Sequence, residues 1–231
     1  DVRDFEKINS VLDQYNIRRI IHAAAVTPSL DEELANPERI MEINFGGTVN
    51  VIHAARESAV DRIVFVSSNS IYGDVEGDNV LVTEEHPLNA RNLYSIAKIA
   101  SELYCRRIQE LSGIQILIGR ISSAYGPMEH PTPARNHMSL IYQIVQEAIA
   151  GNEVRIYGES LNRNWTHVYD LAAALTTLLK KENLSYSEYN LSYGCSYSLA
   201  ELLETVKKVE PKFRYCFTGA EKDANLILSS G

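Results

Sequence analysis

The sequence has no run of apolar residues long enough to span a membrane, which takes about 18 to 20 in succession. Its first residues, DVRDFEKINS, lack the basic start and apolar stretch of a secretory signal. Only three cysteines occur in 231 residues, at the separated positions Cys105, Cys195 and Cys216. An odd and dispersed set favours reduced thiols over a disulfide framework. The sequence therefore predicts a cytoplasmic protein without membrane contact.

Positive charge is also scarce, because 22 lysine and arginine residues stand against 30 aspartate and glutamate residues. No basic run stands out, so we expect no binding to nucleic acid, which needs clustered cations against phosphates. The six histidines form neither an H-E-x-x-H pair nor a cluster with cysteine at zinc spacing. No G-x-S-x-G elbow is present either. We predict no metal site and no serine hydrolase.

What the chain does contain is an alternation of helical stripes and short, wholly apolar segments. Strands are predicted at RRIIHAAA (18–25), DRIVFVSS (61–68) and IQILIGRIS (114–122), each preceded by a helix, at 4–15, 36–58 and 93–111. Strands this apolar have no face for water, so helices must cover both sides of the sheet. The predicted fold class is α/β, a doubly wound parallel sheet.

A change of composition after Gly126-Pro127 predicts a second, smaller lobe. The polar loop EHPTPARNH precedes an amphipathic helix, and short alternating segments such as VRIYG and NWTHV follow it. The predicted division is a core of residues 1–127, to which 164–182 return, and a lobe of residues 128–163 and 183–231.

The pentapeptide YSIAK (94–98) places a tyrosine and a lysine four residues apart near the start of a predicted helix. Positions i and i+4 share a helix face, so Tyr94 and Lys98 can reach one site. A nearby cation lowers a tyrosine pKa from its usual value of about 10, which would let Tyr94 act as a general base. In a chain with 13 tyrosines, the pentapeptide alone is equally consistent with a helix pair of no function.

Two serines, Ser67 and Ser68, end the predicted strand 61–68 at its carboxyl edge. Ligands of open α/β sheets bind beyond that edge, where a hydroxyl can hydrogen-bond a substrate oxygen. Serines are also ordinary turn residues, and alone these two favour a turn. Together with YSIAK, the two serines favour a ligand site at this strand end over a simple turn.

Six blocks of sequence, in this order, resemble the extended short-chain dehydrogenase/reductases, and among them the NAD-dependent epimerase/dehydratase group that acts on nucleotide sugars. The blocks are HAAAV (22–26), INFGGTVNVIHAAR (43–56), VSSNSIYG (66–73), YSIAK (94–98), GRISSAYGP (119–127) and RNWTHVYDLA (163–172). The resemblance covers nearly the whole chain. It implies a Rossmann-like fold, a nucleotide-sugar substrate, and NAD as cofactor, with NADP left open.

The resemblance also implies roles for individual residues. Tyr94 would take the proton of a sugar hydroxyl, Lys98 would hold the nicotinamide ribose and lower the Tyr94 pKa, and Ser68 would hydrogen-bond the same oxygen. The other implied cofactor contacts are Asp1, Val2, Ala23, Ala24, Ala25, Asn44, Ser67 and Ile121, with Asn44 also supporting the site. The implied substrate contacts are Ser68, Asn69, Ser123 and Arg163, with Arg163 on the nucleotide diphosphate.

Within this group the sequence favours an epimerase, which oxidises a hydroxyl carbon and returns hydride to the other face of the keto intermediate. Dehydratases of the group place an acidic pair directly after their Thr or Ser, whereas Ser68 is followed by Asn69 and Ser70. A dehydrogenase or reductase that releases its product is the alternative, and the sugar and its reacting carbon stay open. By analogy, a homodimer would form through helices 37–58 and 93–111.

The opening strand, glycine-rich turn and helix with which the family holds the cofactor pyrophosphate do not occur in this sequence. Its first residues, DVRD, instead resemble a later aspartate and hydrophobic residue that touch the adenine. We therefore expect either a fragment of a longer protein or a non-catalytic remnant that binds a nucleotide sugar or a partner chain.

Overall fold

The computed structural model describes residues 1–75, 81–132, 135, 137–157 and 162–218. The chain divides into two compact units. The first comprises Asp1–Ser122, Pro131–His137 and Asp170–Leu191, and the second comprises Ser123–His130, Met138–Tyr169 and Ser192–Gly231.

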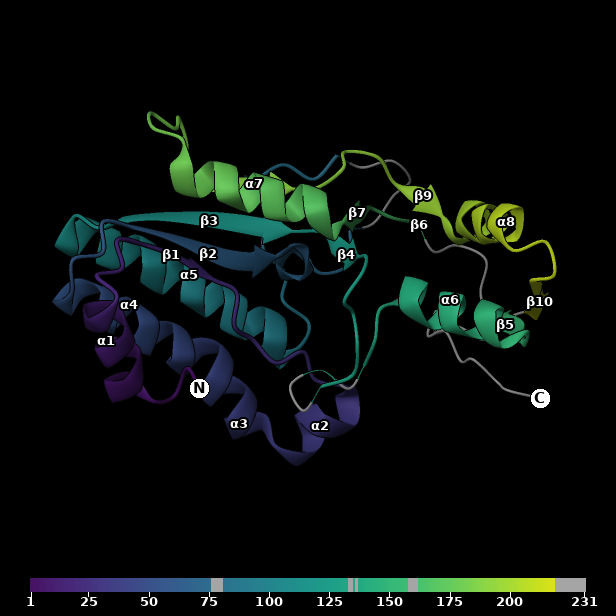
Figure 1. The fold of residues 1–231 in the computed structure, drawn as a ribbon, viewed down its shortest axis with the longest axis horizontal. Helices are drawn as coiled ribbons and strands as arrows, with labels where there is room; N and C mark the ends of the chain where they lie inside the picture. Colours follow the sequence, from purple (N-terminus) through teal and green to yellow (C-terminus); the bar gives the residue numbers. More distant parts are fainter. Residues whose placement is uncertain (76–80, 133–134, 136, 158–161, 219–231) are drawn as a thin grey trace. The chain divides into compact units, whose positions relative to one another are not determined.

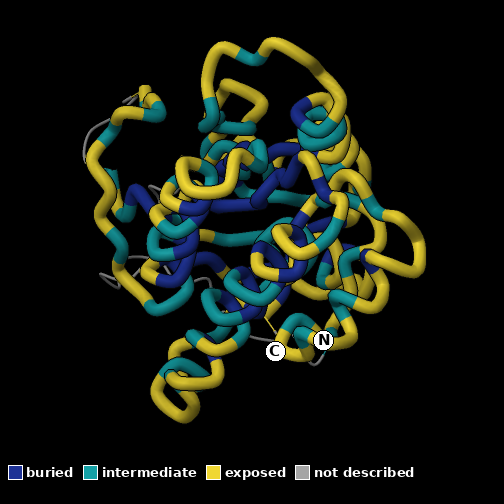
Figure 2. Tube along the Cα trace, turned by 90° about the vertical axis from the view of Figure 1, so that its left-hand side faces the viewer, coloured by how far each residue is buried: buried dark blue, intermediate teal, exposed yellow. Residues whose placement is uncertain are grey.

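The first unit is built on a four-stranded sheet in the order β1-β2-β3-β8 (Figure 1). Its strands are β1 Arg19–His22, β2 Arg62–Ser68, β3 Gln115–Ile121 and β8 Glu188–Leu191, and each pairs in parallel with its neighbour. All seven residues of β2 are buried, and the buried residues of β2 and β3 appear dark blue in Figure 2. The predicted parallel sheet is confirmed.

Helices cover both faces of this sheet (Figure 1). On one face, α1 Phe5–Gln14, α4 Gly47–Glu57 and α5 Leu93–Ser112 share a core cluster with Ile63 and Phe65 of β2. On the other, Leu178 of α7 Val168–Lys180 packs with Val64 of β2. Successive strand side chains point to opposite faces, so neighbouring β2 residues enter different clusters. The sheet is doubly wound, as predicted.

The helix predicted over 36–58 consists of α3 Pro37–Met41, η1 Glu42–Gly46 and α4. Pro37 takes the first helical position, where its missing N–H costs nothing. The middle segment η1 is a π-helical turn, which the sequence did not predict. Such turns occur often at functional sites, and this one carries Asn44. A short helix, α2 Leu30–Ala35, precedes it.

The described residues of the second unit form three two-stranded sheets. They are the parallel pairs β5 Glu153–Tyr157 with β10 Arg214–Thr218 and β4 Ser123–Tyr125 with β7 Trp165–His167, and the antiparallel pair β6 Asn162–Arg163 with β9 Tyr197–Ser198. Helices α6 Leu140–Ala150 and α8 Leu199–Val209 contribute Ile144 and Leu203 to an apolar cluster with Val154 of β5.

The two units differ from the predicted core and lobe at three places. The segment that returns to the core is Asp170–Leu191 and not 164–182, because β7 pairs with β4 in the second unit and Glu188–Leu191 pairs with β3 in the main sheet. The core ends at Ser122 and not at residue 127, and Pro131–His137, predicted in the lobe, belongs to the first unit. No helix in the described ranges is long and apolar enough to cross a membrane.

Candidate active site

The end of β2 and the start of α5 bring Ser68 and Tyr94 together. Ser68 Oγ accepts a hydrogen bond from the Ser70 N–H at 3.2 Å, which begins the 3₁₀ turn η2 Asn69–Tyr72. The Ser68 side chain lies close enough to the Tyr94 phenol to oppose the rise of its pKa. The turn ends at Gly73 with φ of 66°, where a Cβ would lie 2.2 Å from the Asn89 carbonyl oxygen. Only glycine fits there, so the backbone after Ser68 is held in one path.

The N-terminus of α5 is fixed by two side chains. Asn92 caps the helix and accepts from the Ser95 N–H at 2.9 Å, in a capping box. The Glu33 carboxylate of α2 accepts from the Leu93 N–H at 2.6 Å. Helix termini leave such N–H groups without internal partners, and a carboxylate there is favoured by the helix dipole. The turn that carries Tyr94 is therefore anchored.

Lys98 is buried beneath this turn, with 2% of its surface exposed. Its Nζ donates to the Val66 carbonyl at 2.8 Å and lies 5.6 Å from the centre of the Tyr94 ring. Burial lowers the pKa of Lys98 to about 8, with Cys105 and Glu102 acting in the opposite direction. An ammonium has three N–H donors, so Lys98 has donors beyond the one that Val66 accepts.

Burial raises the pKa of Tyr94, and the opposing effects of the Ser68 side chain and of the Arg135 charge do not cancel this. The Lys98 ammonium is held at the Val66 carbonyl. That Lys98 lowers the pKa of Tyr94 stays a prediction.

Asn44 holds the segment that follows β1. Its Oδ1 accepts from the Val26 N–H at 2.8 Å, and its Nδ2 donates to the Val26 carbonyl at 2.9 Å. This pair of bonds fixes the backbone beside Ala23 and Ala24, both of which are exposed. The cofactor contacts of Asn44 and of Ala23, Ala24 and Ala25 stay predictions.

His22, the last residue of β1, is 4% exposed, and its Nε2 lies 3.0 Å from Thr48 Oγ1. Burial, with a smaller effect of the Lys98 charge, lowers the pKa of His22 to about 4. The ring is therefore neutral in the folded protein at neutral pH.

We expect His22 to make the protein less stable as the pH falls from about 6.5 toward 4. Over that range the unfolded state takes up a proton that the folded state does not, so the free energy of unfolding decreases with falling pH. At about 1.4 kcal/mol per pKa unit, the loss approaches ~3 kcal/mol. Urea unfolding at a series of pH values measures it. His22→Gln should flatten the dependence relative to the exposed control His53→Gln; equal slopes would contradict the assignment.

The other predicted contacts lie in both units. In the first unit, the Asp1 carboxylate pairs with Arg3 at 2.6 Å, and the Val2 carbonyl accepts from Asn50 at 3.0 Å. Ile121 ends β3. The Ser67 hydroxyl is 1% exposed and donates to Glu102, so its partner is internal.

Asn69 of the first unit is exposed in η2. The second unit contains the remaining two predicted contacts: Ser123 pairs with Trp165, and Arg163 lies exposed opposite Tyr197.

Sequence reasoning missed Glu102 and Arg120, which form a buried ion pair directly behind Ser67. The available signals were a charged residue inside the apolar segment IQILIGRIS and a glutamate four residues after Lys98 on the same helix face. Among the described residues, no group of three or more His, Cys, Asp and Glu side chains could hold a metal ion.

The chain matches the model of the NAD dependent epimerase/dehydratase family over residues 1–192. It is 30% identical over 210 residues to the low-salt glycan biosynthesis protein Agl12 of Haloferax volcanii, covering 90% of this chain and 63% of that protein. It is 29% identical over 192 residues to dTDP-glucose 4,6-dehydratase of Mycolicibacterium smegmatis, covering 82% and 55%. For a putative UDP-glucose 4-epimerase of Methanocaldococcus jannaschii the identity is 28% over 209 residues, covering 90% and 65%. The chain thus spans less than two thirds of each relative.

Solved structures show the same fold. UDP-glucose 4-epimerase of Thermus thermophilus, in complex with NAD, matches with a TM-score of 0.82 at 23% identity. The match covers 100% of this chain and 75% of the epimerase chain. DesIV, a dTDP-glucose 4,6-dehydratase of Streptomyces venezuelae with NAD bound, has a TM-score of 0.78 at 24% identity, covering 100% and 69%. Because the family model extends over the sheet of the first unit, over Ser68 at the end of β2 and over Tyr94 of α5, this chain belongs to the NAD-dependent epimerase/dehydratase family.

Proposed function

We propose that the protein is an NAD-dependent epimerase that acts on a nucleotide sugar. The observation that carries the proposal is the meeting of the Tyr94 phenol with the Ser68 hydroxyl, above the buried Lys98 ammonium. As a phenolate, Tyr94 would take the proton of a sugar hydroxyl during oxidation and return it during reduction, while Ser68 hydrogen-bonds the same oxygen. Burial raises the pKa of Tyr94, so forming the phenolate requires positive charge beside it, which bound NAD⁺ and the Lys98 ammonium would supply.

The residues present fit a nicotinamide cofactor. Lys98 has N–H donors for ribose hydroxyls, and Ala23 and Ala24 leave the backbone exposed at the carboxyl end of β1, where such ligands bind. Bound NAD would supply the acceptor and donor of hydride. The remaining proposed contacts are those of Asp1, Val2, Ala25, Asn44, Ser67 and Ile121 with the cofactor, and of Asn69, Ser123 and Arg163 with the substrate.

An epimerase is favoured over a dehydratase because the turn after Ser68 has no acidic side chain. Elimination of water needs one group to protonate the leaving hydroxyl and another to remove a carbon-bound proton. Asn69 and Ser70 occupy the positions that directly follow Ser68, and neither is an acid or a base at neutral pH. Returning hydride to the opposite face of the same carbon makes no such demand.

The proposal extends to the state of the protein. We propose a homodimer through the helices at 37–58 and 93–111, by analogy with the family, and a cytoplasmic location. Free thiols at Cys105, Cys195 and Cys216 support the latter, because they fit a reducing compartment.

The test incubates the purified protein with NAD and UDP- or dTDP-linked sugars and follows the sugar carbons by NMR. We expect inversion at one hydroxyl-bearing carbon without net formation of NADH. Loss of water would show a dehydratase instead, and accumulating NADH would show a dehydrogenase. If calorimetry detected no NAD binding and no sugar changed, the proposed function would be wrong and the non-catalytic reading would replace it.

A further inference from the structure

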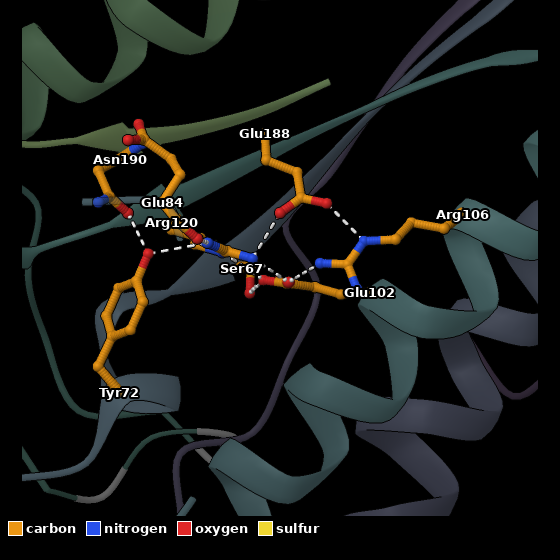
Figure 3. Close-up of polar contacts among 8 residues, drawn as sticks. All are labelled: Ser67, Tyr72, Glu84, Glu102, Arg106, Arg120, Glu188 and Asn190. Carbon is orange, nitrogen blue, oxygen red and sulfur yellow. Dashed lines mark hydrogen bonds and ion pairs between the residues drawn. The ribbon is translucent and has the colours of Figure 1, made fainter. Parts of the chain in front are cut away.

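A buried polar cluster joins α5 to the sheet (Figure 3). The Glu102 cluster, as we call it, consists of Ser67, Tyr72, Glu84, Glu102, Arg106, Arg120, Glu188 and Asn190. At its centre, Glu102 is 0% exposed and Arg120 is 2% exposed. Taking charges out of water is costly unless each is paired and hydrogen-bonded, and such a pair is weak evidence for stability alone.

The Glu102 carboxylate is satisfied on both oxygens. Oε1 accepts from Ser67 Oγ at 2.6 Å and from Arg120 Nε at 3.0 Å. Oε2 accepts from Arg120 Nη2 at 2.7 Å and from Arg106 Nη2 at 3.2 Å. The bidentate pairing with Arg120 fixes the orientation of both side chains as well as their distance.

Arg120 uses all five of its N–H donors, two of them on Glu102. Nη1 donates to the Tyr72 hydroxyl at 2.8 Å and to the Glu84 carbonyl at 2.8 Å. Nη2 also donates to Glu188 at 2.7 Å. The guanidinium therefore has one allowed position, set by β8, by η2 and by the segment around Glu84 as well as by α5.

The register of the sheet places residues of the Glu102 cluster directly beside the end of β2. Arg120 of β3 is the direct partner of Ser67 on one side and of Asn190 on the other. Side chains at paired positions of a parallel sheet lie on the same face, so these three form one polar row across the sheet. Figure 3 shows Glu102 of α5 meeting this row from the helix side.

Two elements, α5 and β2, each carry residues of both the Glu102 cluster and the candidate site. Tyr94, Lys98 and Glu102 follow one another at intervals of four residues on one face of α5. On β2, Ser67 directly precedes Ser68. Two hydrogen bonds thus join the strand end that carries Ser68 to the helix that carries Tyr94: Ser67 donates to Glu102, and Lys98 donates to the Val66 carbonyl.

We propose that Glu102 is a positioning residue. Together with Arg120, it holds the end of β2 against α5 through Ser67, and so fixes the Ser68 hydroxyl relative to the Tyr94 phenol. The catalytic part of this inference rests on the proposed function. Small displacements at a site of proton transfer reduce the rate without weakening substrate binding.

A purely structural ion pair would behave differently, and the chain offers one as a control. Arg62, at the amino end of β2, is 4% exposed and donates to the carbonyls of Leu179 at 3.0 Å and Lys181 at 2.9 Å. It also pairs with Glu182 at 3.1 Å. Arg62→Gln should therefore destabilise the fold while leaving Ser68 and Tyr94 in place.

The kinetic experiment compares Ser67→Ala, Glu102→Gln and Arg62→Gln in the full chain with NAD and nucleotide sugar. Ser67→Ala keeps the Glu102–Arg120 pair and the Lys98–Val66 bond and removes the bond from Ser67 to Glu102, so kcat should fall on the order of tenfold while KM stays within about twofold. Glu102→Gln should lower kcat on the order of 100-fold. Arg62→Gln should keep the wild-type kcat at a temperature where it is folded.

A second readout needs no activity. In protein labelled at tyrosine ¹³Cζ, the resonance that Tyr94→Phe removes identifies Tyr94, and its shift reports the surroundings of the Tyr94 hydroxyl, of which Ser68 is part. We expect Ser67→Ala and Glu102→Gln to change the chemical shift of this resonance and Arg62→Gln to leave it unchanged.

An unchanged chemical shift together with wild-type kcat in Ser67→Ala would overturn the inference. If the wild-type chain turns over no sugar, the proposed function fails while the NMR comparison still decides the positioning role. If Glu102→Gln does not fold, Ser67→Ala decides.

Discussion

Replacing Tyr94 by phenylalanine is expected to lower kcat on the nucleotide sugar by roughly 10²- to 10⁴-fold, the usual effect of removing a proton-transfer group. The ring is kept, so its packing at 5.6 Å from Lys98 Nζ and the caps of α5 are unchanged. What disappears is the hydroxyl that lies near Ser68 and would carry the proton. Steady-state kinetics at saturating sugar measures the loss, and KM should stay within a few-fold.

Tyr104→Phe is the matched control for this variant. Tyr104 lies on the same helix, is partly buried, and meets Phe45 edge-to-face with ring centres 6.2 Å apart. That contact needs the ring and not the hydroxyl. Tyr104→Phe should therefore keep the wild-type kcat. A Tyr94→Phe enzyme that also stayed within about threefold of wild type would show that another group carries the proton.

The central sheet could be predicted because the apolar composition of its strands shows that both of their faces are buried. IQILIGRIS and DRIVFVSS are too apolar for a wet face, which dictates a covered parallel sheet. β8 gave no such signal, because all four residues of Glu188–Leu191 are only partly buried. Its place beside Ile118–Ile121 depends on a pairing across the fold that local composition does not encode.

The candidate site likewise has features that the sequence predicted and features that it did not. The spacing of Tyr94 and Lys98 on one helix face is local, and it was predicted. The effect of burial on the Tyr94 pKa was not, because it depends on how deeply the folded chain buries the phenol. The Ser67–Glu102 bond likewise arises from packing between elements distant in sequence.

The largest effect on stability is expected from Arg120→Met, which should lower the free energy of unfolding by about 3 to 5 kcal/mol. The variant leaves the Glu102 carboxylate at 0% exposure, with Ser67 and the partly exposed Arg106 as its remaining partners. Breaking one side of a buried pair costs more than the pair contributes, because the other charge stays out of water. Urea unfolding at pH 7 measures the difference.

Two further variants show whether the unpaired charge is the cause. Arg106→Met removes a cation that is 34% exposed in its side chain and should cost about 1 kcal/mol or less. The double variant Arg120→Met with Glu102→Leu removes both buried charges and should recover part of the loss, although the Tyr72 hydroxyl and Glu188 lose a donor. Equal losses in the single Arg120 variant and the double variant would mean that these outer partners of Arg120, and not the ion pair, stabilise the first unit.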